Sequence, residues 1–183
     1  MSFFKNKKII FLTKTNWDYY LHPYRTLYAK ELLNYDCKIY WINQPTRNPL
    51  RYLKKLLNKS FRNINVKIYT PLLFTCTNEN LSLLNSFLLR IQLFFLSGKI
   101  DSNTILWSVY CSHNNIVNSY PYAFKIYWPG DLFNAKEEQE SLLFYNLIMP
   151  LTEDNFVYIK NIYPHKAFLS TTGCDTNIFS IKK

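Results

Sequence analysis

The sequence predicts an α/β domain built on an open, doubly wound parallel sheet. Short segments rich in β-branched and aromatic residues alternate with helical segments along the chain of 183 residues. The connections between them are short, which favours βαβ units with right-handed crossovers. Because 48% of the residues are hydrophobic, the chain can fill a single core. We therefore expect residues 1–183 to form one domain.

Six segments have the composition of strands. Continuous apolar residues, as in the first segment, are typical of a parallel strand that is buried on both faces. In chain order the segments are residues 7–13, 38–43, 66–69, 104–109, 124–128 and 147–151. Ligands of such sheets bind beside the carboxyl ends of the strands, so the loops after these segments are the places to look for a site.

Helical patterns separate the strands. Pro23 fits the first turn of a helix that ends near Asn34, and a basic helix is expected over about residues 50–59. Gly98 stands where a left-handed cap would end the next helix. That helix has the clearest pattern, with five apolar residues on one face: Leu81, Leu84, Leu88, Ile91 and Phe95.

Two further helices have recognisable beginnings. Asn134 and Glu137 have the spacing of a capping box, which predicts a helix that runs to about Tyr145. Thr152 is expected to cap a short helix, with Glu153 favourably placed at its positive end. Because they follow the sixth strand segment, Thr152 and Glu153 are candidates to line a ligand cleft.

Charge and apolar length limit the class of protein. Lys and Arg outnumber Asp and Glu by 22 to 12, and a net charge of +10 favours an anionic partner such as a phospholipid surface or a phosphorylated substrate. The longest apolar stretch, residues 87–96, is far shorter than the about 20 residues that span a bilayer. We expect a cytoplasmic protein that associates peripherally with the inner face of the membrane. Nucleic-acid binding is disfavoured, because the scattered basic residues lack the aromatic-flanked motifs of an RRM and the pattern of a helix-turn-helix.

Cysteines and histidines do not form a metal-binding pattern. The four cysteines are far apart and include no CxxC pair, so reduced, mostly buried thiols are expected. His22, His113 and His165 lie in different loops without an i, i+4 pairing. The sequence thus predicts neither a metal site nor a bound cofactor.

The loop after the first strand, residues 13–22, contains no glycine. Dinucleotide-binding and P-loop motifs need glycines there for the backbone to approach a phosphate, so both functions are disfavoured. Trp17 instead offers an aromatic surface that suits stacking on a sugar ring, beside polar groups that can bind its hydroxyls. The candidate acceptor-binding residues are Asn16, Trp17, Asp18 and His22. Alternatively, Trp17 only closes the end of the sheet.

Asp131 is the candidate catalytic residue. It follows the fifth strand segment and Gly130, which permits close approach of a ligand, so its carboxylate is placed to act as an acid or base. The competing interpretation is structural, because an aspartate at this position also stabilises the turn before the helix at Asn134.

The end of the chain carries a family resemblance. The segment Asn146 to Thr152 resembles the "aDxvxxxS" motif, and Thr172 to Phe179 the "NGVDxxxF" motif, of the N-terminal domain in GT-B glycosyltransferases of the family 4 type. Trp17 and Arg25, followed by the helix at Leu27 to Leu32, look like the start of that domain. Asn146, Thr172 and Cys174 depart from the family's Asp, Asn and Val.

The resemblance implies a Rossmann-like acceptor-binding domain, the N-terminal half of a GT-B enzyme. In that family a C-terminal domain, absent from these residues, binds the nucleotide-sugar donor, and the wider group builds bacterial surface polysaccharides and lipid-linked glycans. The sugar would then pass to a glycan or lipid-linked acceptor, and this half would be inactive alone. Gly173 would line the cleft with Thr152 and Glu153. A non-catalytic α/β binding or regulatory module that uses the same cleft is the alternative.

Overall fold

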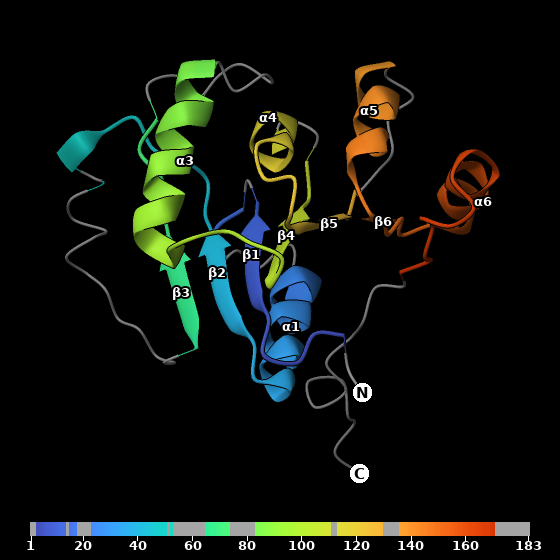
Figure 1. Cartoon of the computed structure of the whole chain (residues 1–183), viewed down its shortest axis with the longest axis horizontal. Coiled ribbons are helices and arrows are strands. Elements are labelled where there is room, and N and C mark those ends of the chain that lie inside the picture. The colour runs from blue at the N-terminus through green and yellow to red at the C-terminus, as the bar shows by residue number, and fades with distance from the viewer. Residues whose placement is uncertain are drawn as a thin grey trace, which may run out of the picture.

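The fold contains a six-stranded sheet with strand order β3-β2-β1-β4-β5-β6, in which every neighbouring pair is parallel. Figure 1 shows the computed structural model. The structure describes residues 3–13, 15–17, 23–50, 52, 65–73, 83–110, 113–129 and 136–170. The chain starts at a central strand and winds outward in both directions, which is the Rossmann-like order. The predicted doubly wound α/β fold is thus confirmed.

All six predicted strands are present. They are β1 (Lys8–Leu12), β2 (Lys38–Ile42), β3 (Val66–Tyr69), β4 (Thr104–Ser108), β5 (Phe124–Tyr127) and β6 (Leu147–Ile148). β6 is shorter than expected, since Pro150 has no amide hydrogen to donate to a ladder. Beyond α6 (Glu153–Ile162), the Phe168 amide donates to the Ile148 carbonyl oxygen at 2.9 Å, so the chain returns beside β6.

The helices flank the sheet (Figure 1). They are α1 (Pro23–Glu31), α3 (Leu83–Ser97), α4 (Asn114–Asn118), α5 (Lys136–Ser141) and α6 (Glu153–Ile162). Turns of 3-10 helix extend α1 and α5 at 32–35 and 142–144. The sequence pattern did not predict α4. Most of the basic helix expected over 50–59, and the capping box at Asn134, lie outside the described residues.

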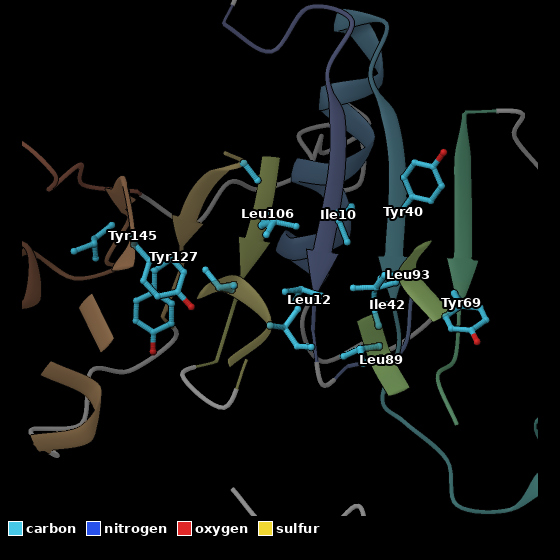
Figure 2. Close-up of a cluster of buried hydrophobic side chains, with 14 of the residues drawn as sticks. Ile10, Leu12, Tyr40, Ile42, Tyr69, Leu89, Leu93, Leu106, Tyr127 and Tyr145 are labelled. Carbon is cyan, nitrogen blue, oxygen red and sulfur yellow. The ribbon is translucent and has the colours of Figure 1, made fainter. Parts of the chain in front are cut away.

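The central strand β1 divides the hydrophobic core in two. Ile9 and Phe11 belong to a cluster with Ala29 of α1, whereas Ile10 and Leu12 belong to the cluster on the opposite face. Figure 2 shows part of this second cluster, to which α3 and α4 also contribute. Side chains alternate between the faces of a strand, so a continuous apolar run is what a sheet covered on both sides requires.

Helix α3 packs on the sheet through a different face from the one that its sequence pattern suggests. Of the five apolar residues predicted to share a face, Leu84, Ile91 and Phe95 are exposed to solvent. The helix packs on the sheet through Leu89 and Leu93, which belong to the core cluster. Gly98 ends the helix with a φ of +70°, as predicted, because glycine adopts this left-handed conformation without steric cost.

Cys37 is the cysteine whose surroundings the structure describes. Its side chain is fully buried, and the thiol donates to the Phe4 carbonyl oxygen at 3.0 Å. Burial raises the pKa of the Cys37 thiol, since the interior disfavours the thiolate. Cys37 thus fits the expectation of a buried thiol. Cys76, Cys111 and Cys174 lie outside the described residues.

Candidate functional site

At the carboxyl edge of the sheet, the chain leaves the adjacent strands β1 and β4 toward opposite faces. After β1 the chain enters α1, whose Ala29 packs on one face of the sheet. After β4 it enters α4, whose Ile116 and Val117 pack on the other face. Parallel sheets bind ligands where their connections diverge in this way. The ends of β1 and β4 are therefore the geometric centre of the candidate site.

Hydrogen bonds fasten the loop after β1 to β2. The Thr13 hydroxyl lies 2.9 Å from the Ile42 carbonyl oxygen and 2.8 Å from that of Thr15. The Trp17 amide donates to Oδ1 of Asn43 at 2.9 Å, and the Asn43 side-chain nitrogen donates to the Thr70 hydroxyl at 3.2 Å. Asn43 and Thr70 are themselves buried. The part of this loop that the structure describes is thus held in place by the ends of β2 and β3.

Trp17 is half-buried and packs edge-on against Trp41, with ring centroids 5.0 Å apart. Trp41 is fully buried, and its indole nitrogen donates to the Thr15 carbonyl oxygen at 3.2 Å. The inner part of Trp17 therefore helps to close the end of the sheet, while part of the indole remains exposed. Asn16 beside it is exposed. The two interpretations of Trp17 are physically compatible.

A second polar group lies at the end of β4. The hydroxyl of Ser108, the last residue of the strand, lies 2.9 Å from the Tyr110 carbonyl oxygen and 3.2 Å from Nδ1 of His113. Ser108 and His113 are both buried. If Ser108 gives its single proton to the carbonyl, Nδ1 of His113 must donate to Ser108, which leaves Nε2 as the acceptor of a neutral ring.

Arg25 of α1 connects the loops that follow β1 and β4. Only 4% of its surface is exposed, although it carries a full positive charge. Its guanidinium carbon lies 5.6 Å from the centre of the Tyr110 ring, and Nη1 lies 3.5 Å from the Tyr110 hydroxyl. A buried guanidinium beside an aromatic ring offers planar hydrogen-bond donors to an oxygen-rich or anionic group.

The structure places Thr152 and Glu153 at the same edge but away from this centre. They follow β6, which three strand spacings, or about 14 Å, separate from β1. Thr152 is the N-cap of α6, as predicted, and its hydroxyl accepts from the Asn155 amide at 3.4 Å. The predicted site residues Asp18, His22, Asp131 and Gly173 lie outside the described residues.

Sequence reasoning missed the group around Arg25. Ser108 and Tyr110 were not singled out, and His113 was considered only as a metal ligand. The available signal was Ser108, a hydroxyl at the end of the otherwise apolar β4 segment Ile105 to Trp107. A polar residue at the carboxyl end of a buried parallel strand is worth attention, because it lies at the edge where ligands bind.

Within the ranges that the structure describes, no three His, Cys, Asp or Glu side chains are arranged to hold a metal ion. In the same ranges no helix has the length and apolarity needed to cross a membrane. The sequence matches no known protein family. No curated protein matches it either.

Proposed function

We propose that this chain is the acceptor-binding half of a GT-B glycosyltransferase of the family 4 type. The reaction would move a sugar from a nucleotide-sugar donor to a glycan or lipid-linked acceptor, in the synthesis of a surface polysaccharide. The observation that carries the proposal is the half-buried Trp17, fastened beside the end of β1 on the sheet edge where parallel folds bind ligands. The motif resemblance supplies the reaction class.

The polar groups at this edge suit a saccharide. An aromatic surface stacks on the apolar face of a sugar ring, while a few fixed polar groups bind the hydroxyls. Near Trp17, the Thr15 hydroxyl oxygen is buried and makes no hydrogen bond with any residue in the described part of the chain. Arg25 and His113 place a guanidinium and an imidazole on the β4 side of this edge.

The proposed division of labour comes from the family resemblance. This half binds the acceptor and orients the hydroxyl that attacks the anomeric carbon, which lowers the entropic cost of reaction. Asp131, outside the described residues, remains our candidate for the base that accepts the hydroxyl proton. A separate domain would hold the donor and stabilise the charge of the departing phosphate.

Substitution of Trp17 tests the proposal. We expect Trp17→Ala to weaken saccharide binding by about tenfold or more, the equivalent of about 1.4 kcal/mol, because the stacking surface is lost. Binding is measured by titration calorimetry with glycans and with lipid-linked saccharides in micelles. Loss of the contact with Trp41 is expected to cost about 0.5–1.5 kcal/mol of stability, which leaves the domain folded.

Tyr122→Ala is the matched control. Tyr122 is 81% exposed and precedes β5, so it lies at the opposite edge of the sheet. This variant should bind saccharides as the unchanged protein does. The proposal fails if folded Trp17→Ala protein retains full saccharide affinity, or if no saccharide binds the unchanged protein.

A further inference from the structure

The outer face of α3 is apolar and uncovered. Six large hydrophobic side chains on this helix are between 39% and 82% exposed: Leu83, Leu84, Phe87, Ile91, Phe94 and Phe95. Leu83, Phe87, Ile91 and Phe95 follow one another at every fourth position, so they form a continuous stripe along the helix. Isolated exposed apolar residues are ordinary on protein surfaces, but a contiguous patch marks an interaction site.

Hydrogen bonds and buried side chains on the inner face hold α3 in the orientation that exposes its apolar side. Gln92 donates to the Leu72 carbonyl oxygen at 2.9 Å and accepts from the Leu72 amide at 3.0 Å. Asn85, Ser86 and Ser97 are buried, as are Leu89 and Leu93, which belong to the core cluster on this face of the sheet. The helix thus buries polar residues and exposes apolar ones, so the outer face requires an apolar environment of its own.

Positive charge is concentrated in the same part of the chain. Residues 37–100, which include β2, β3 and α3, contain ten Lys or Arg and a single acidic residue, Glu79. This segment therefore carries +9 of the net charge of +10. Figure 1 shows α3 lying over β2 and β3 at this edge of the sheet.

Four lysines form a cationic rim, which we define as Lys8, Lys38, Lys67 and Lys99. Lys8 and Lys38 are register partners at the amino ends of β1 and β2. Lys67 of β3 pairs with Tyr40 and lies 5.4 Å from its ring centre, on the α3 side of the sheet. The Lys8 ammonium donates to the Lys99 carbonyl oxygen at 2.7 Å, just after α3. The rim therefore lies at the α3 end that carries Phe94 and Phe95.

We propose that the outer face of α3 and the cationic rim dock on an anionic lipid bilayer, with the helix lying in the interface. Interfacial helices bind by burying an apolar face among the acyl chains, while nearby Lys and Arg attract acidic headgroups. A second copy of the chain fits the patch poorly, because the cationic rims of the two copies would repel each other. The proposal does not depend on the reaction that the domain serves.

Vesicle co-sedimentation tests the docking surface. The protein should pellet with phosphatidylcholine vesicles that contain about one third phosphatidylglycerol, and binding should fall sharply as salt screens the charges. We expect the double variant Phe94→Ser with Phe95→Ser to bind at least tenfold more weakly. Lys67→Gln with Lys99→Gln should weaken binding at low salt. All four substituted residues are exposed, so circular dichroism should show that the variants are folded.

The matched control is Leu143→Ser with Phe168→Ser, which removes two similarly exposed apolar residues beside α5 and β6. Its vesicle binding should equal that of the unchanged protein. The proposal is overturned if neutral vesicles bind as well as anionic ones, or if both double serine variants lose binding equally. It is also overturned if sedimentation velocity shows a dimer that Phe94→Ser with Phe95→Ser converts to a monomer, because the patch would then join two copies.

Discussion

Replacement of Trp41 by alanine should lower the free energy of unfolding by about 3–5 kcal/mol, the usual cost of deleting a large buried aromatic side chain. Trp41 is fully buried in the second strand of the sheet and packs against Phe11 at 5.2 Å and Trp17 at 5.0 Å. Its indole also holds the Thr15 carbonyl. The variant should lose saccharide affinity as well as stability, because Trp17 loses its support. Chemical denaturation and calorimetry measure the two effects.

A pair of conservative variants separates packing from hydrogen bonding at this position. Trp107 is also buried and stacks on Phe11 at 5.0 Å, but its indole nitrogen makes no hydrogen bond with the residues that the structure describes. Trp41→Phe should therefore cost about 1 kcal/mol more than Trp107→Phe, the net value of one hydrogen bond. Equal losses of stability would show that the bond to Thr15 contributes nothing to holding the loop.

Gln92→Ala is expected to lower the free energy of unfolding by about 2–6 kcal/mol, because it removes four hydrogen bonds of roughly 0.5–1.5 kcal/mol each. Oε1 of Gln92 accepts from the Tyr69 hydroxyl at 2.7 Å and from the Leu72 amide. Its nitrogen donates to the Leu72 and Leu88 carbonyl oxygens. The Tyr69 hydroxyl is the donor in its bond to Gln92, and burial raises its pKa further above the ordinary value. Urea denaturation measures the loss.

Gln139→Ala is the control for this substitution. Gln139 lies on α5, is exposed and makes one described hydrogen bond, to the Tyr158 hydroxyl at 2.7 Å. Its replacement should change stability by less than about 0.5 kcal/mol. If Gln92→Ala is equally mild, Gln92 does not fasten α3 to the sheet, and the orientation of the exposed apolar face loses its main support.

Local sequence patterns were sufficient to predict most of the strands and helix ends. The apolar run at Ile9 to Leu12 predicted a strand covered on both faces, because a continuous apolar run leaves neither face of the strand polar. Gly98 and Thr152 were recognised as caps because their roles depend on backbone geometry and on near neighbours alone.

Features that depend on distant parts of the chain escaped prediction. α3 is apolar on several sides, so its sequence does not say whether Leu84 and Phe95, or Leu89 and Leu93, face the sheet. Hydrogen bonds between Gln92 and the segment after β3 fix which face of α3 packs on the sheet. No local sequence pattern predicts these bonds. α4 has five residues, too few for a helical period to be visible.

The candidate site was also only partly predictable. Trp17 was recognised from its loop and the end of the sheet, where the structure places it. Arg25 and Tyr110 are 85 positions apart in the sequence. They come into contact because β1 and β4 are neighbours in the sheet. Such a contact follows from the strand order, which local patterns do not specify.

The most direct test of the saccharide site is ¹⁹F NMR of protein labelled with fluorotryptophan. The chain has four tryptophans, and Trp41, Trp107 and Trp128 are each at most 2% exposed, whereas Trp17 is half-buried. Single Trp→Phe variants assign the four signals. Titration with a glycan or lipid-linked acceptor should shift the Trp17 signal most. Saccharide binding that leaves the Trp17 signal unmoved, or no binding at all, would contradict the proposed acceptor site.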